Sequence, residues 1–231
     1  MTGRGALLHG AVCALAILTG CVGPQTRNEL PEPVARSVGR YDTVRQFETA
    51  PTSLRREPAA GHPYDWLDRQ HAEFRWVTAP ALGEHVMFLE WRRGGPDGPI
   101  SRQRVWVFNR RDAGWVMDFY TLPDGGGTSR SRLDDDFRGL SSEQLVGYGD
   151  TCSLLSTRTG AALVFSIPPT CSIVARSGRR MQLSAVVRFE PDRILYREQG
   201  VLDGGAIAFV VPGVPGVSYE FVRERVGPPY Q

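Results

Sequence analysis

The sequence predicts an all-β fold, an antiparallel sandwich or barrel of about ten strands in one domain. Short apolar runs recur from residue 73 onward, with Gly, Asp and Pro turns between them, a pattern typical of antiparallel sheets. The connections are too short for the crossover helices that parallel pairing requires. A chain of 231 residues, 41% of them hydrophobic, suits a single core, since one all-β domain commonly exceeds about 200 residues.

The strands are expected where Val, Ile, Phe, Tyr and Trp concentrate. Their residue ranges are 74–80, 85–91, 104–109, 115–120, 162–167, 172–176, 181–189, 194–199, 206–211 and 218–224. Turns are expected at 93–98, 110–114, 156–160, 176–180, 190–193 and 202–205, which are rich in Gly, Asp, Pro and Arg.

Helix is expected in two short places only. Residues 34–47 can open with a helical turn that breaks at Gly39, and residues 50–65 lack periodicity and are expected to form a loop. A short inserted helix is expected at 140–147, where Ser141 and Gln144 have capping-box spacing ahead of Leu145.

The N-terminus has the pattern of a lipoprotein signal. Arg4 precedes an apolar run at 6–18, and Leu18-Thr19-Gly20-Cys21 follows, which is typical of a cleaved secretory signal. Acylation of Cys21 would anchor the protein in a membrane. The alternative is an ordinary signal that ends near a chance cysteine. We therefore expect a signal peptide at 1–20, a flexible tether at 21–33 that starts with lipidated Cys21, and a β domain at 34–231. Val22 stands where Asp would favour inner-membrane retention, so we expect the periplasmic side of the outer membrane.

Export would leave Cys152 and Cys171 as the only pair of free cysteines. An even pair in an oxidising compartment usually forms a disulfide. A loop of about twenty residues would then be closed, with a stabilisation of about 3 kcal/mol. The rival is a metal site, but no Cys-x-x-Cys or His-x-x-x-His spacing accompanies the pair, and we predict no structural metal.

The charge and the strand patterns limit the function. The net charge of +2 is too small to indicate a nucleic-acid partner. Arg102 and Arg104 share one strand face with Trp106 and Phe108. Such a mixed face suits a barrel interior that holds a ligand, and it suits equally an outer face on which arginine stems cover apolar surface.

Seven motifs in chain order resemble the CpcT/CpeT family of chromophore lyases over about residues 34–224. The most specific is Arg102-Gln103-Arg104-Val105, although Ser101 stands where the family usually has Tyr. The other six are Gly39-Arg40-Tyr41-Asp42-Thr43 with Gln46, Phe88-Leu89-Glu90, Asp150-Thr151-Cys152, Phe165 with Cys171, Leu202-Asp203-Gly204-Gly205, and Tyr219-Glu220-Phe221.

The resemblance implies a calycin-like up-and-down barrel and a lyase that delivers an open-chain tetrapyrrole, a bilin, to a cysteine of a phycobiliprotein. It implies no resident cofactor other than the bilin as ligand, and it assigns no catalytic residue. The residues that it places against the ligand are Tyr41, Glu90, Arg102, Gln103, Arg104, Trp106, Tyr120 and Asp203. Two arginines on one strand face suit the two propionates of such a ligand, because each guanidinium can bind a carboxylate through two hydrogen bonds.

Three functions stay open on these grounds. The chain can be a ligand-binding barrel lipoprotein, a true chromophore lyase with a phycobiliprotein-like client, or an envelope structural or interaction lipoprotein whose barrel is filled. The family activity is cytoplasmic whereas this chain carries an export signal, so enzyme activity is left open. The sequence lacks a Gly-x-Ser-x-Gly motif, a phosphate-binding loop with Lys and a zinc-helix signature, which argues against those enzyme classes.

Overall fold

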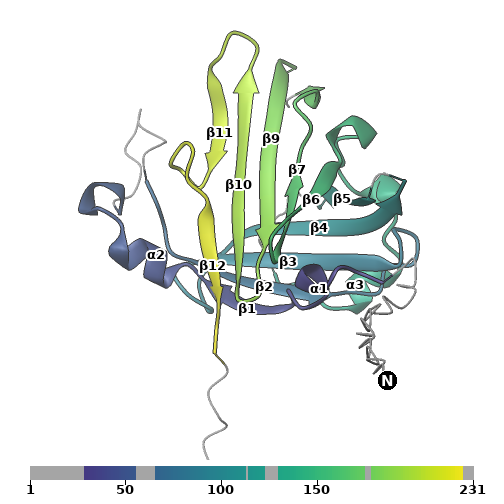
Figure 1. Cartoon of the computed structure of the whole chain (residues 1–231), viewed down its shortest axis with the longest axis horizontal. Coiled ribbons are helices and arrows are strands. Elements are labelled where there is room, and N and C mark those ends of the chain that lie inside the picture. Colours follow the sequence, from purple (N-terminus) through teal and green to yellow (C-terminus); the bar gives the residue numbers. More distant parts are fainter. Residues whose placement is uncertain (1–28, 56–65, 113, 123–129, 175–177, 226–231) are drawn as a thin grey trace, which may run out of the picture.

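The computed structural model describes residues 29–55, 66–112, 114–122, 130–174 and 178–225. Twelve antiparallel strands form one sheet in the order β11-β10-β12-β1-β2-β3-β4-β5-β6-β7-β9-β8, and β9 also pairs with β10. That last pairing closes ten of the strands into a barrel. The expected all-β fold is therefore confirmed (Figure 1).

Each of the ten expected runs overlaps a strand. They are β2 (Gln70–Trp76), β3 (His85–Arg93), β4 (Ile100–Arg111), β5 (Gly114–Tyr120), β7 (Ala162–Ser166), β8 (Ser172–Val174), β9 (Arg180–Phe189), β10 (Arg193–Leu202), β11 (Ile207–Val211) and β12 (Tyr219–Arg223).

Two strands were not expected from the sequence. β1 (Gly39–Asp42) begins at Gly39, where the expected helical turn was predicted to break, and β6 (Leu154–Thr159) occupies most of an expected turn. β1 pairs with both β2 and β12 and so joins the two ends of the domain. β6 alternates in burial only weakly, because most of its side chains face solvent, and its polar composition therefore resembles a turn.

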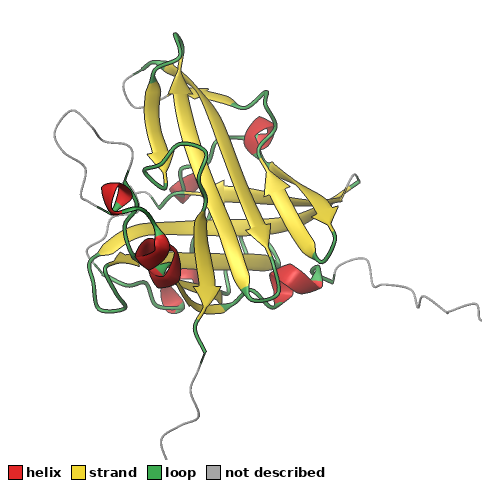
Figure 2. Cartoon of the chain, turned by 60° about the vertical axis from the view of Figure 1, so that its left-hand side comes forward, coloured by secondary structure: helices red, strands yellow, loops and turns green. Residues whose placement is uncertain are grey.

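The helices are short and lie at the barrel's ends and outside it (Figure 2). α1 (Glu32–Ala35) and α2 (Val44–Thr49) flank β1, with a 3₁₀ turn at Thr52–Leu54. α1 begins at Glu32, inside the segment expected to be a tether. Residues 1–28, with the expected signal and Cys21, lie outside the described residues.

The outer face of β3 and β4 is covered by a second small core. Phe137 from α3 (Asp135–Arg138) packs on Phe88, and Leu145 joins the same cluster. The capping box of Ser141 and Gln144 is present, and the segment that follows it is a 3₁₀ turn at Ser142–Gln144 in place of the longer helix expected at 140–147.

The main core fills the barrel interior. Side chains that alternate along each strand meet there, and the largest of them are aromatic. The fully buried aromatic residues of this core are Tyr41, Phe74, Trp91, Trp106, Phe108, Phe165, Phe189 and Phe221. One end of the barrel also takes the buried side chain of Val34 from α1.

Candidate functional site

The barrel interior contains a buried ion pair between two opposite strands. Arg102 of β4 donates from Nη1 to Glu198 Oε2 of β10 at 2.5 Å and to the Tyr196 hydroxyl at 2.9 Å. The Tyr196 hydroxyl donates in turn to the same Glu198 oxygen at 2.7 Å. The Arg102 guanidinium also lies over the Trp91 ring, 5.1 Å from its centroid, a position that favours a cation.

Arg104 lies two residues further along β4 on the same inner face. Its Nη1 donates to the backbone carbonyl of Gln103 at 2.9 Å, while its buried Nε has no hydrogen-bond partner. Burial lowers the pKa of Arg104, and the neighbouring Arg102 lowers it further. Glu198 acts in the opposite direction. The two arginines therefore share one carboxylate.

The electrostatics of the cluster favour the ionised pair. Burial raises the pKa of Glu198, but the charges of Arg102 and Arg104 and the two hydrogen bonds outweigh it, so the pKa is lowered. Burial raises the pKa of Tyr196, and the charge of Glu198 raises it further. Tyr196 is therefore a neutral hydrogen-bond donor, and the three charged groups sum to one excess positive charge.

A second polar group lies next to the first, around Asp68. The Tyr219 hydroxyl donates to Asp68 Oδ1, and Arg93 Nε donates to Asp68 Oδ2 at 3.1 Å. Gln70 donates to the same carboxylate at 2.5 Å and accepts from Ser101 at 2.7 Å. Burial raises the pKa of Tyr219, with Asp68 as the next cause. The charge of Asp68 is thus balanced by Arg93.

Of the eight residues expected to contact a ligand, the structure brings Arg102, Arg104 and Trp106 together on the inner face of β4. Glu90 and Gln103 lie on the outer face instead. Gln103 Nε2 donates to Glu90 Oε2 at 2.7 Å and to the Arg130 carbonyl at 3.1 Å. β-strand alternation turns these two side chains away from the cup, the part of the barrel interior that surrounds Arg102 and Arg104. They hold the segment before α3 against the outer wall of the barrel.

The expected stacking residues are not gathered at one surface. Tyr41 and Trp106 are 1% exposed within the packed core, and Tyr41 donates to the Ser37 carbonyl at 2.9 Å. Tyr120 lies on the outer face with the second core. Asp203 is exposed in the turn between β10 and β11, away from the arginines on β4.

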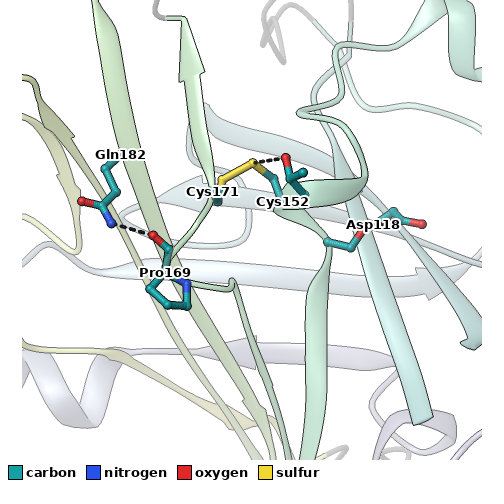
Figure 3. Close-up of a disulfide and its surroundings, with 7 residues drawn as sticks. Asp118, Cys152, Pro169, Cys171 and Gln182 are labelled. Atoms are coloured by element: carbon teal, nitrogen blue, oxygen red, sulfur yellow. Dashed lines mark hydrogen bonds between the residues drawn. A yellow bond between two sulfur atoms is a disulfide. The ribbon is translucent and has the colours of Figure 1, made fainter. Parts of the chain in front are cut away.

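The expected disulfide is confirmed. Cys152 and Cys171 are bonded, with their Cα atoms 4.7 Å apart, and both are buried in the main core. The bond joins the 3₁₀ turn Asp150–Cys152 to the residue before β8 (Figure 3). Beside it, Gln182 Nε2 of β9 donates to the Pro169 carbonyl at 2.7 Å.

The disulfide closes a segment that borders the cup. Tyr148 packs on Phe119 of β5 with ring centroids 4.9 Å apart, and it is close enough to influence the pKa of Arg104. A cavity of about 120 Å³ lies between this segment and the end of β5. It is smaller than the usual small-molecule site of about 300–1000 Å³.

The described residues hold neither a metal cluster nor a membrane-spanning helix. Within them, no cluster of three or more His, Cys, Asp or Glu side chains is placed to share a metal ion. Across the same ranges, no helix is long and apolar enough to cross a bilayer.

Sequence reasoning missed the residues that complete the cluster, namely Glu198, Tyr196, Tyr219 and Asp68. A signal for two of them exists, since alternation along 193–202 places Ile194, Tyr196 and Glu198 on one face. A lone carboxylate on an apolar strand face indicates a buried partner. The identity of that partner depends on barrel closure, which the sequence does not state.

Comparison with known proteins identifies the fold. No family model matches the sequence, and no curated protein matches it. Among solved structures, the chain is similar to the CRL protein of Arabidopsis, with a TM-score of 0.60 and 13% sequence identity over 87% of this chain and 100% of that one. At this identity the likeness shows the fold alone, a closed antiparallel barrel similar to that of CRL.

Proposed function

We propose that the barrel binds an extended, carboxylate-bearing ligand such as a linear tetrapyrrole, with Arg104 as the anchor for a carboxylate. The proposal is supported by the resemblance of the motifs around Arg102-Gln103-Arg104 to the CpcT/CpeT family. The observation that carries it is the charge imbalance inside the cup. Arg102 and Arg104 face one carboxylate, Glu198, and Arg104 Nε is unpaired.

An anion beside Arg104 would neutralise the excess positive charge and would accept a hydrogen bond from Arg104 Nε. A buried cation without a partner is costly, and a ligand carboxylate would neutralise it through charge-assisted hydrogen bonds. Arg102 keeps 15% of its side-chain surface exposed, so the cluster lies within reach of solvent at one end of the packed core. The bound ligand would contact Tyr148 on the side that the disulfide holds in place.

Titration of the full chain with biliverdin tests the proposal. We expect a shift of the absorbance bands and quenching of tryptophan fluorescence at micromolar ligand. Biliverdin dimethyl ester, which lacks the two carboxylates, should bind about tenfold or more weakly, since a charge-assisted hydrogen bond contributes about 1.5–3 kcal/mol.

The matched variant is Arg104→Gln. It should weaken binding of the diacid and leave binding of the ester unchanged, whereas Arg45→Gln on exposed α2 should change neither. No spectral change with correctly folded protein at tens of micromolar biliverdin would reject the tetrapyrrole. Equal affinity of diacid and ester would reject Arg104 as the anchor.

The family activity is bilin–protein ligation, and we infer that any such activity would require a phycobiliprotein-like client. Co-expression of the full chain with a bilin and a phycobiliprotein β-subunit should then yield a covalent, acid-stable coloured adduct. A non-covalent complex without an adduct would leave a ligand-binding protein and exclude a lyase.

We further propose that the chain is exported and anchored by lipid on Cys21, facing the periplasm from the outer membrane. The signal pattern at 1–21 supports this. Metabolic labelling with a palmitate analogue should mark the wild type, and Cys21→Ser should lose the label and stay unprocessed. Labelling that persists in Cys21→Ser would contradict the assignment.

A second candidate is a structural or interaction protein of the envelope whose barrel is filled. The interlocking aromatic core favours it, because Trp106 is stacked on Tyr196 with an interplanar angle of 11° and Trp91 meets Tyr219 edge to face. This function predicts that no titrated bilin, diacid or ester, alters the absorbance or fluorescence.

A further inference from the structure

A groove about 1000 Å³ in volume lies at the barrel end that α1 covers, far along β4 from the cup arginines. One wall is the chain from Glu29 to Arg36, and the other is formed by the ends of β4, β5, β6 and β7. Its size is at the upper end of the range for small-molecule sites, about 300–1000 Å³. The groove is separate from the Arg104 cluster, which does not line it.

Two arginines in this groove have no ionic partner within the part of the chain that the structure describes. Arg110 and Arg158 are exposed and line it, and neither takes part in a salt bridge or side-chain hydrogen bond among the described residues. A third arginine, Arg36, is already paired with Glu32 at 3.0 Å. Glu29 is the remaining carboxylate, so the groove carries one excess positive charge.

The rest of the lining is mostly apolar. Leu30 packs partly against the main core, and Trp115 and Leu163 contribute buried surface, with prolines at both rims. The Trp115 backbone N–H is already satisfied by Ser156 Oγ at 3.1 Å. A groove that combines apolar side chains with two unpaired arginines matches a molecule that has a hydrocarbon part and an anionic head.

We propose that this groove binds an anionic amphiphile, with its hydrocarbon part against Leu30 and the prolines and its phosphate or carboxylate head between Arg110 and Arg158. Arginine suits this task because its planar guanidinium binds such oxygens through two parallel hydrogen bonds. The chemistry is shared by free amphiphiles and by anionic lipid head groups. The proposal does not depend on the cup ligand or on acylation of Cys21.

Calorimetric titration of the full chain with dodecyl phosphate, below its micelle concentration, tests the site. We expect saturable binding that weakens about tenfold in Arg110→Gln and in Arg158→Gln, as expected for loss of a charge-assisted contact. Arg45→Gln, an exposed arginine on α2, is the control and should bind as the wild type. The wild type and all variants have the same N-terminal segment, so its contribution cancels in the comparison.

Three further titrations separate the sources of the ligand chemistry. Inorganic phosphate and neutral dodecyl maltoside should each bind much more weakly than dodecyl phosphate. Vesicles that contain phosphatidylglycerol should retain the wild type more than Arg110→Gln if a membrane lipid can occupy the groove, and equally if only a free amphiphile can; both results support the site. Wild-type affinity in both arginine variants, or equal binding of phosphate or maltoside, would overturn it.

Discussion

Glu198 is the residue on which the charges inside the barrel depend. It is 3% exposed and is the carboxylate that lowers the cost of burying both Arg102 and Arg104. A buried pair contributes little compared with a hydrophobic replacement of both partners, but removal of one partner leaves an uncompensated charge. The single residue therefore decides whether two cations can stay inside the barrel.

Glu198→Gln should lower the free energy of unfolding at pH 7 by about 3–5 kcal/mol, the range for breaking a buried pair. Tyr196→Phe, which removes a donor to the same oxygen and an acceptor for Arg102 but no charge, should cost less, about 1–2 kcal/mol. Urea denaturation of the two variants measures the difference. Equal costs would show that the charge of Glu198 stabilises the cluster no more than the hydroxyl of Tyr196 does.

The pH dependence of the same variant has a definite sign. The folded pKa of Glu198 is lowered from its ordinary value of 4.5, so its contribution is complete above that value and is lost as pH falls through the folded pKa. The difference in unfolding free energy between the wild type and Glu198→Gln should therefore be largest near neutral pH and shrink below about 4.5. A difference that grows as the pH falls would contradict the assignment.

At the scale of elements, the segment around α3 is held to the barrel by Glu90. This carboxylate accepts from Arg92 at 2.7 Å, from Ser131 at 2.9 Å and from Gln103 at 2.7 Å. The first and third donors lie on β3 and β4, and the second lies in the segment before α3. Glu90 therefore attaches the segment before α3 to the outer face of β3 and β4.

Glu90→Gln should weaken this attachment without opening the barrel. We expect faster amide hydrogen exchange in residues 130–138 and unchanged exchange in β9 and β10, because local opening has a lower free energy than global unfolding. Hydrogen-exchange mass spectrometry checks this. Glu48→Gln, on exposed α2, is the control and should leave 130–138 as in the wild type.

The disulfide is a second feature that stabilises the arrangement of the elements. Cys152 and Cys171 are 19 residues apart, and a loop of that length contributes about 3 kcal/mol by restricting the unfolded chain. The double variant Cys152→Ala/Cys171→Ala should lose about that much stability and become insensitive to dithiothreitol in thermal melts. A wild type that melts identically with and without reductant would refute the contribution.

The whole molecule is a closed sheet around one aromatic core, with β9 and β10 as the closing pair. Their register extends over nine residue pairs from Ile194↔Phe189 to Leu202↔Met181. Closure removes most free sheet edges and couples every strand to the same interior. The molecule should therefore unfold as a unit.

Trp106→Ala tests this coupling from the centre of the core. Trp106 contacts Phe74, Phe189 and Tyr196 from three different strands, so the cavity should cost about 3–5 kcal/mol. Far-ultraviolet circular dichroism and tryptophan fluorescence should still report one coincident transition. Separate transitions would mean that the sheet has two independently stable parts.

Much of the fold is predictable from local pattern. Ten strands follow from apolar runs between turn residues, the Ser141 capping box follows from spacing, and the shared face of Arg102, Arg104 and Trp106 follows from alternation. These features depend on neighbours in the chain, whose geometry is set by backbone period. The polar strand β6 was not predicted, because its residues pair in a sheet but bury little apolar surface.

The tertiary structure alone decided which faces are inside and which residues meet. A two-residue period states that Gln103 points away from the face of Arg104, but not which of the two faces lies inside the barrel. The register of β3 against β4 places Glu90 beside Gln103. The partner of Arg102 comes from β10, 96 residues later. Such a contact forms only when the sheet closes. Sequence therefore determined the strands and the candidate arginines, while closure of the barrel assigned Glu198 to them and moved Glu90 and Gln103 to the outer wall.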